Sequence, residues 1–517
     1  MSSPKIELAS KEKTDTLALG FFSKKSEKKE KKKGPPPSPE FHGTSSSDLT
    51  ALQGRLQDSH HFTGRRNDTN LLRYYQYGAS YQRYFWSAWE IFQSLKLEKP
   101  RGQRCGRLFR PATRKAQRHH GGRAKSLAKV DSKEIPRYSL LFCEGYGLAG
   151  YEFTDLKQEK PTRFKPSALY ISGLEKNPAN SKAIQTAAAL CDSINFARAL
   201  GDRPGNYATP DLLAQLVGNM AKSVGLKCTV FNKARIIKEK MGLLMGVGQG
   251  SVEEPRFIIL EYKGGKKAEP PVALIGKGIT FDTGGISIKP ALKMEEMKYD
   301  MMGSATVAGT MMAIAKLKLP VNVTGYIAAA ENMPGGKAQK PGDIATSVTG
   351  KTVEVINTDA EGRLALADAI EYAQKENPQA ILDYATLTGA VIVALGTLAT
   401  GIMGNSRELI ERVEAASEAT DEMVWELPLF EEFDEYLRSP FADIKNASDL
   451  REAGSSIGGT FLKFFVDKKI PWVHCDIAGS GMQRRDKNYM PRNYAAGAMI
   501  RLNTHLLANW ERIKPTN

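Results

Sequence analysis

The feature that most constrains the fold is the regular alternation of strand-like and helix-like segments beyond residue 180. Apolar residues at helical spacing predict a long helix over Ala183–Leu200, which Gly201 and Pro204 end. Further strands are expected at Phe257–Tyr262, Val272–Ile275, Val323–Ala328 and Ala380–Leu387, and helices at Pro210–Ser223, Ser304–Ala315 and Gly362–Gln374. This alternation predicts an α/β fold whose mostly parallel sheet is flanked by helices. Active sites of such sheets gather at the carboxyl ends of the strands.

The chain before residue 180 departs from this pattern. A length of 517 residues suggests two or more domains. Residues 1–48 hold a lysine-rich run and three consecutive prolines, so we expect a basic, disordered tail. Residues 49–179 are expected to form a smaller, atypical N-terminal α/β domain, with short strands at Ser139–Cys143 and Ala168–Ile171. Residues 180–517 are expected to form the catalytic domain.

Residues 49–133 show only weak strand-like alternation, so the sequence does not define a folded domain there. Lys99–Lys129 carries eleven lysines or arginines and no acid. Three interpretations stay open: a solvated linker, a basic arm for nucleic acid or a membrane surface, and an out-of-frame reading of the coding DNA.

Cysteines and apolar runs bear on the compartment. The five cysteines form no CxxC pair and are odd in number, which is typical of a reducing environment. The N-terminus has no signal-like apolar region, and no apolar run is long enough to span a bilayer. We therefore expect a soluble, cytoplasmic protein with no membrane partner.

Histidine usage limits the kinds of metal site. The chain has seven histidines, and none lies between Gly121 and Val473. A zinc site of the HExxH type is therefore excluded from most of the predicted catalytic domain, and any metal there must be held mainly by carboxylates. The candidate carboxylates near expected strand ends are Asp282, Asp300, Asp359 and Glu361.

Asp359 and Glu361 follow the apparent strand Val353–Ile356 in alternating positions, so they can face one point. Close carboxylates repel unless a cation neutralises them, and two divalent ions about 3.5–4 Å apart would do so and bind an attacking water. Lys277 could be a ligand only as a neutral amine. Lys289 and Arg363 would stay cationic and could stabilise an oxyanion or hold an anion.

Each of these residues also has an ordinary interpretation. Asp359 and Glu361 could be first-turn acids of a helix, and Asp282 could be a turn residue before two glycines. Asp300 could be a solvated helix-end acid, and the lysines could lie on the surface. A phosphate loop at Lys277 is disfavoured because glycine follows the lysine where Ser or Thr is needed. The joint appearance of these residues at strand ends favours the metal site.

Several motifs then resemble those of the leucine aminopeptidase (cytosol aminopeptidase) family. Residues 357–364, Asn-Thr-Asp-Ala-Glu-Gly-Arg-Leu, resemble the family signature, and residues 276–282 with Gly284, Gly285 and Lys289 match a second hallmark. Residues 331–334, 340–343 and 385–389 also look like family segments, and the resemblance runs from about residue 183 to residue 506.

The resemblance implies a metalloaminopeptidase that removes N-terminal leucine and other apolar residues from peptides with a free N-terminus. It implies five metal ligands, in which Asp282 and Glu361 bridge two ions, Asp359 completes the tighter site, and Lys277 and Asp300 complete the exchangeable one. The ions would be Mn²⁺ foremost, with Zn²⁺ as the alternative. Lys289 and Arg363 would be catalytic: Lys289 polarises the scissile carbonyl, and Arg363 holds a bicarbonate that relays a proton.

The resemblance further implies a homohexamer and an apolar pocket lined by Met297, Thr386 and Ala478. The chain departs from the family pattern at residues 480–482 and 495–497, which puts the pocket shape in question. An alternative function is a DNA-binding architectural role through the basic N-terminal half. A third hypothesis, a relative that has lost catalysis, is disfavoured by the complete set of seven site residues.

Overall fold

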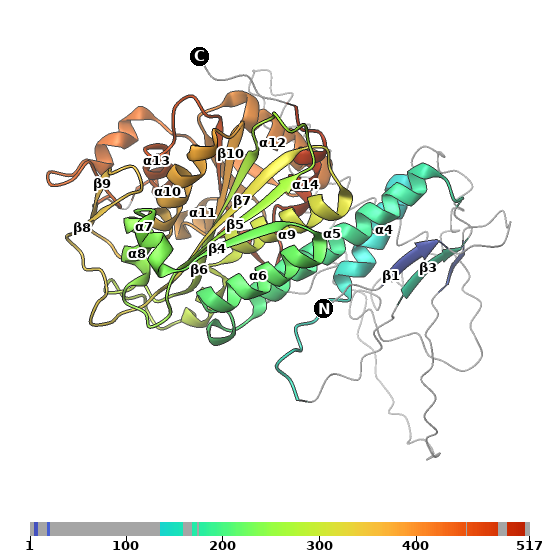
Figure 1. The fold of residues 1–517 in the computed structure, drawn as a ribbon, viewed down its shortest axis with the longest axis horizontal. Coiled ribbons are helices and arrows are strands. Elements are labelled where there is room, and N and C mark those ends of the chain that lie inside the picture. Colours follow the sequence, from blue (N-terminus) through green and yellow to red (C-terminus); the bar gives the residue numbers. More distant parts are fainter. Residues whose placement is uncertain are drawn as a thin grey trace, which may run out of the picture.

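A computed structural model describes residues 5–8, 18–20, 135–158, 168–172, 175–450, 452–483 and 494–511. Its centre is an eight-stranded sheet with the order β12-β11-β14-β10-β6-β7-β5-β4 (Figure 1). The strands are β4 (Lys227–Phe231), β5 (Arg256–Lys263), β6 (Val272–Asp282), β7 (Asn322–Asn332), β10 (Ala380–Ala385), β11 (Thr400–Gly404), β12 (Val424–Glu426) and β14 (Trp472–Asp476).

The middle of this sheet is parallel. β14, β10, β6 and β7 run in one direction, and β11 and β12 are parallel to each other. Antiparallel pairs occur where β11 meets β14 and where β5 meets β7 and β4. The predicted α/β class with a mostly parallel sheet is confirmed, and every strand expected beyond residue 180 is present.

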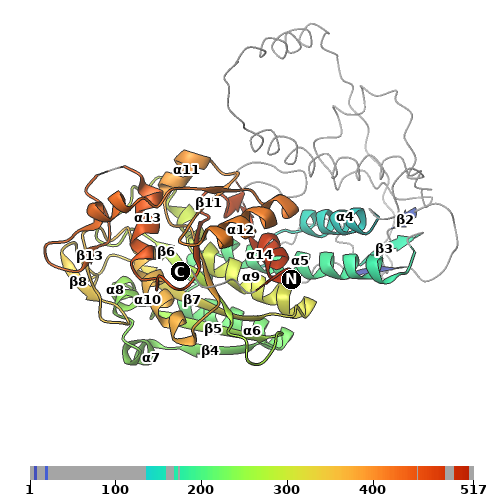
Figure 2. The ribbon, with the colours of Figure 1, turned by 90° about the horizontal axis from the view of Figure 1, so that it is seen from above.

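Helices cover both faces of the sheet, as Figures 1 and 2 show. The apolar side chains of one face pack with α5 (Pro178–Asp202), α6 (Pro210–Val224), α9 (Met302–Leu317), α12 (Arg407–Thr420) and α14 (Ile500–Ala508). Those of the other face pack with α8 (Gly242–Gly248), α10 (Gly362–Ala373) and α13 (Gly454–Lys463). Strands buried on both faces explain the nearly continuous apolar runs of β6, β7 and β10.

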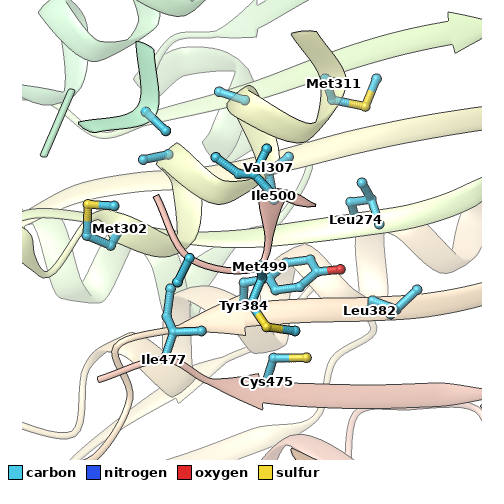
Figure 3. Packing of buried hydrophobic residues seen from close by; sticks show 14 of the residues in the cluster. Leu274, Met302, Val307, Met311, Leu382, Tyr384, Cys475, Ile477, Met499 and Ile500 are labelled. Carbon is cyan, nitrogen blue, oxygen red and sulfur yellow. The ribbon is translucent and has the colours of Figure 1, made fainter. Parts of the chain in front are cut away.

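The core holds the middle strands against α9 and α14 (Figure 3). Leu274 of β6 and Leu382 of β10 are buried with Val307 of α9 and Ile500 of α14. Burying each such side chain contributes about 1.5–3 kcal/mol relative to exposure. Tyr384 is also buried, and its hydroxyl donates a 2.9 Å hydrogen bond to Oδ1 of Asn503, so this core polar group is satisfied. The packing fixes the strands whose ends carry the candidate site.

The expected strand at Ser139–Cys143 is wrong, because this segment lies in α4 (Ile135–Ala149). Leu148 of α4 belongs to the same hydrophobic core as Cys191 and Ile194 of α5, on one face of the eight-stranded sheet. A Cβ on Gly147 would lie 2.5 Å from Sγ of Cys191, so this glycine permits the close approach of the two helices. A short apolar run does not by itself distinguish a strand from a buried helix, which explains the error.

The strand expected at Ala168–Ile171 is present as β3 (Ala168–Ser172). It pairs with β1 (Lys5–Leu8) and β2 (Ala18–Gly20) in a three-stranded sheet. Two short segments of the expected disordered tail are therefore strands. The other residues of 1–48, and the basic run Lys99–Lys129, lie outside the described residues.

The remaining elements are small. The other helices are α7 (Lys233–Lys238), α11 (Gly389–Leu395) and the 3₁₀ turns η2 (Gly205–Tyr207), η3 (Met294–Tyr299), η4 (Gln374–Glu376) and η5 (Glu431–Leu437). The other strands are β8 (Asp343–Thr346), β9 (Thr352–Val355), β13 (Ile444–Lys445), β15 (Met482–Gln483) and β16 (Tyr494–Ala495). Within the described part of the chain, no helix has the length and apolar character needed to cross a membrane.

Candidate active site

The candidate residues meet at the carboxyl edge of the parallel strands. β6 ends at Asp282, β7 at Asn332 and β10 one residue before Thr386. Because parallel strands end on the same edge of a sheet, these side chains come together although they are far apart in the sequence. A register shift between Ile279 and Asp282 marks an irregularity in β6 just before Asp282, and bulges of this kind re-aim side chains.

Lys277 lies at the centre of one half of the site. Its Nζ is 2.8 Å from Oδ2 of Asp300 and 2.9 Å from Oε1 of Glu361. It also donates a 3.1 Å hydrogen bond to the carbonyl oxygen of Thr386, whose hydroxyl donates to Oδ1 of Asp300 at 2.8 Å. Lys277, Asp300 and Glu361 are all buried. The structure thus brings residues from β6, the end of η3 and the start of α10 into one cluster.

Lys289 lies at the centre of the other half of the site. Its Nζ lies 2.8 Å from Oδ2 of Asp282 and 2.5 Å from Oδ1 of Asp359. Three carboxylate oxygens, one each from Asp282, Asp359 and Glu361, lie within 4.8 Å of one another. The two halves of the site are therefore continuous. Six of the seven predicted site residues therefore meet in one place.

Charge in this cluster is unbalanced. Four carboxylates face two ammonium groups, which leaves a formal charge of −2. Burial raises the pKa of Glu361 and of Asp300, and the nearby charge of Asp282 raises both further. The pKa of Asp359 is raised by the same two causes. At all three carboxylates, burial and the charge of Asp282 outweigh the opposing effect of the neighbouring lysines on the pKa.

The two lysines respond in the opposite sense. Burial alone would lower the pKa of Lys277, but Asp300 and Glu361 outweigh it and raise the pKa above its ordinary value. Burial is likewise outweighed at Lys289, where Asp282 and Asp359 raise the pKa. Lys289 is therefore a fixed positive charge beside the carboxylates. Lys277 would become a ligand only if a divalent ion displaced its proton, which would leave to solvent.

The donor set fits divalent cations. Oδ2 of Asp300, Oδ1 of Asp359 and Oε1 of Glu361 are buried and accept no well-aligned hydrogen bond, although each lies near a lysine. Buried oxygens of this kind are costly unless a cation binds them. Carboxylate oxygens suit hard ions such as Mn²⁺.

Arg363, the seventh predicted residue, lies beside this cluster rather than in it. It is the second residue of α10, and its Nη1 donates a 2.8 Å hydrogen bond to the carbonyl oxygen of Asn446. Burial lowers the pKa of Arg363 to about 10, while the charges of Glu361 and Asp476 oppose that shift. Its Nε is a buried donor without a hydrogen-bond partner. Such a donor fits a small anion.

Asn446 is a residue that the sequence analysis missed. It is fully buried, and its Nδ2 donates to the carbonyl oxygen of Asn357 at 2.7 Å. Its Oδ1 accepts a 2.9 Å hydrogen bond from the backbone of Ile356. Asn446 thus holds both the segment that carries Asp359 and the arginine that follows it. No local motif surrounds Asn446, so no sequence signal indicated this role.

The predicted pocket residues lie near the same edge. Met297 on η3, Thr386 after β10 and Ala478 after β14 are half-buried. Thr386 has the additional contacts with Lys277 and Asp300 described above, which the sequence did not indicate. The role of the three residues in a pocket stays a prediction.

Comparisons with known proteins match the part of the chain that contains the candidate site. A protein-family model described as "Cytosol aminopeptidase family, catalytic domain" matches residues 195–504. The chain belongs to the cytosol aminopeptidase family. It is 47% identical over 371 residues to a "Probable cytosol aminopeptidase" of Bdellovibrio bacteriovorus, which covers 71% of this chain and 74% of that protein. A "Probable cytosol aminopeptidase" of Geobacter sulfurreducens is 45% identical over 362 residues, which cover 69% of this chain and 72% of that protein.

A solved structure with a similar fold also matches. The "Bottromycin maturation enzyme BotP in complex with Mn" superposes with a TM-score of 0.67 at 32% identity, covering 72% of this chain and 79% of that one. Membership makes this cytosol aminopeptidase family protein a metal-dependent peptide hydrolase that acts at amino termini. The DNA-binding alternative receives no support from the comparisons, and the basic run on which it depends lies outside the described residues.

Proposed function

We propose that this protein is a two-metal leucyl aminopeptidase. The observation that carries the proposal is the interleaving of Lys277 and Lys289 with four carboxylates at the carboxyl edge of the sheet. Lys277, Asp282, Asp300, Asp359 and Glu361 would hold two divalent ions. When bound, the ions would supply Lewis acidity and an attacking water of lowered pKa.

The two cationic side chains would complete the catalytic machinery. Asp282 and Asp359 raise the pKa of Lys289 in the structure, and its ammonium group would neutralise charge that develops on the scissile carbonyl oxygen. Arg363 would hold a bicarbonate through its unpartnered Nε, and the bound anion would supply a general base beside the attacking water. The hydrogen bond from Arg363 to Asn446 fixes the guanidinium for this role.

The choice of Mn²⁺, with Zn²⁺ as the alternative, is supported by the oxygen-rich donor set and by the Mn named for the BotP structure. Substrates would be peptides with a free N-terminus, because an unprotonated amine can bind a metal ion. Preference for leucine-like side chains rests on the family resemblance and the half-buried Met297, Thr386 and Ala478. A homohexamer and a cytoplasmic location are proposed from the resemblance alone.

A chelation experiment tests the proposal. Full-length protein would be stripped with a chelator, restored with Mn²⁺ or Zn²⁺ separately, and assayed with leucine amide. We expect activity to disappear, to return with a divalent ion, and to be absent with N-acetyl-leucine amide. Asp359→Asn and Glu361→Gln should remove most of the restored activity. Full activity in the chelator, or in either variant, would refute the metal mechanism. Activity on alanine amide well above that on leucine amide would refute the leucyl preference alone.

A further inference from the structure

Asn332 connects two segments that carry candidate ligands. It is the last residue of β7 and is 4% exposed. Its Nδ2 donates to Oδ1 of Asp282 at 2.8 Å and to the carbonyl oxygen of Thr358 at 3.0 Å. Both N–H groups of the amide are therefore used. One restrains a carboxylate at the end of β6, and the other restrains the residue before Asp359.

These contacts decide which oxygen of Asp282 remains available. Oδ1 accepts hydrogen bonds from Asn332 and from the backbone of Gly284, both at 2.8 Å. Oδ2 is the oxygen that faces Lys289, at 2.8 Å. With Oδ1 occupied by two donors, Asp282 presents Oδ2 alone to the centre of the site. These two hydrogen bonds fix the rotation of a carboxylate that would hold an ion.

The surroundings of Asn332 are also rigid. Its carbonyl oxygen accepts hydrogen bonds from the backbone and the hydroxyl of Thr283, at 3.0 and 2.8 Å. Its own Oδ1 lies 2.8 Å from the place that a Cβ on Gly285 would take, and Gly285 has a positive φ of 65°. Thr358 is held from its other side by a 2.6 Å hydrogen bond to the carbonyl oxygen of Gly284. The amide therefore has little freedom to release either acceptor.

We propose that Asn332 is a positioning residue that sets Asp282 and the Asp359 segment for divalent-ion binding. The proposal rests on the proposed metal site. The competing explanation is a purely structural amide that ties β7 to its neighbours. The two explanations differ in one respect: only a positioning role makes the affinity for the ion depend on the side chain of residue 332.

The same strand offers a matched control. Asn322 is the first residue of β7, is also buried, and donates from Nδ2 to the carbonyl oxygens of Lys266 and Glu269 at 2.7 and 2.9 Å. It also accepts a 3.0 Å hydrogen bond from the backbone of Gly265. Asn322 thus resembles Asn332 in burial and hydrogen bonding, but it contacts no candidate ligand. Asn322→Ala should carry the structural cost without the effect on metal binding.

The test is Mn²⁺ titration of chelator-stripped, full-length protein by calorimetry, for wild type, Asn332→Ala, Asn332→Leu and Asn322→Ala. Loss of an outer partner of a metal ligand typically weakens affinity about 10–100-fold. We expect that loss in both Asn332 variants and less than about a threefold change in Asn322→Ala. The leucine variant keeps most of the volume, so it provides the answer if the alanine variant does not fold. Melting temperatures in chelator measure the structural cost separately.

The outcomes separate the two levels of the argument. If wild type binds no Mn²⁺ or Zn²⁺, the proposed metal site fails, and the role of Asn332 fails with it. If wild type binds the ion and the folded Asn332 variants bind it equally well, only the positioning role is overturned. Weaker binding in the Asn332 variants together with unchanged binding in Asn322→Ala supports it.

Discussion

Gly362→Ala is predicted to damage the site with little effect on the fold. Gly362 is the first residue of α10 and follows Glu361 directly. A Cβ there would lie 2.4 Å from Cε and 2.5 Å from Nζ of Lys277. The glycine does not have a positive φ, so alanine can adopt its backbone conformation. The collision with one lysine side chain is therefore the main consequence of the substitution.

The magnitude follows from how firmly Lys277 is held. The lysine is 3% exposed and is fixed by Asp300, Glu361 and the carbonyl oxygen of Thr386, so it can yield only by breaking those contacts. Overpacking of this kind costs about 1–3 kcal/mol. The helix propensity of alanine returns at most about 1 kcal/mol, because position 362 begins the helix. If the cost falls on Lys277 as a ligand, affinity for Mn²⁺ drops about 5- to 150-fold, since 1.4 kcal/mol is tenfold.

The assay is kcat/KM for leucine amide together with Mn²⁺ titration and thermal unfolding. Gly218→Ala in α6 is the control, because a Cβ at Gly218 meets no atom within 4 Å. The control should gain up to about 1 kcal/mol of stability and keep its activity. Wild-type activity and wild-type Mn²⁺ affinity in Gly362→Ala would refute the fixed position of Lys277 and its role as a ligand.

Three further predictions follow from the same geometry. Lys289→Met should lower kcat by about 10²–10³-fold with little change in KM, because it removes a positive charge from the reaction centre. An unchanged kcat would contradict the proposed role of Lys289 in stabilising charge on the scissile carbonyl oxygen. Mn²⁺ affinity should rise as pH passes about 6 and about 8, because burial raises the pKa of Asp300 and of Glu361 to these values, and it should go on rising above that range because Lys277 must also lose a proton. Calorimetry in buffers of different ionisation enthalpy would show proton release on binding, and binding without proton release would contradict the prediction. His474→Gln should destabilise the fold by about 3–5 kcal/mol at low pH, where it breaks the buried 2.5 Å ion pair with Asp383, and by less at high pH.

The sign of the His474 effect follows from its neighbours. Burial lowers the pKa of His474, but Asp383 and Asp476 outweigh burial and the opposing charge of Arg363, so the pKa is raised. A raised pKa means that the ion pair stabilises the fold fully below the ordinary histidine value of about 6.5, and that this contribution is lost as pH rises through the higher value. Denaturant unfolding of wild type and variant at several pH values measures it. A difference that grows with pH would contradict the assignment.

The sheet and the identities of the charged residues could be predicted from the sequence, because both depend on local patterns. β6 and β7 read as apolar runs, and Asp282 stands at the end of one of them. Helix α5 was predicted from the helical spacing of its apolar residues. The observed helix begins five residues earlier, at Pro178, and ends two residues later, at Asp202. The error at α4 has the opposite cause, since the short apolar run at residues 139–143 fits a strand as well as a buried helix, and its partner α5 lies elsewhere in the sequence.

The partners of the charged residues could not be predicted, because they are set by long-range packing. Asn446 reaches Asn357 across 89 positions of sequence, and Asn332 reaches Asp282 across 50. Each is a single polar residue without a motif, and its role depends on which strand ends are neighbours in the sheet. The candidate ligands were therefore accessible from sequence, whereas the hydrogen bonds that orient them required the structure.

The arrangement of the lysines also changes how the carboxylate cluster is understood. From sequence, close carboxylates were expected to repel one another unless metal ions neutralised them. In the structure, Lys277 lies between Asp300 and Glu361, and Lys289 lies between Asp282 and Asp359, so each carboxylate has an ion-pair partner within the chain. These pairs offset half of the formal charge of the carboxylates. Folding and ion binding can therefore be separate events, and stripping the ion should abolish activity while most of the fold survives.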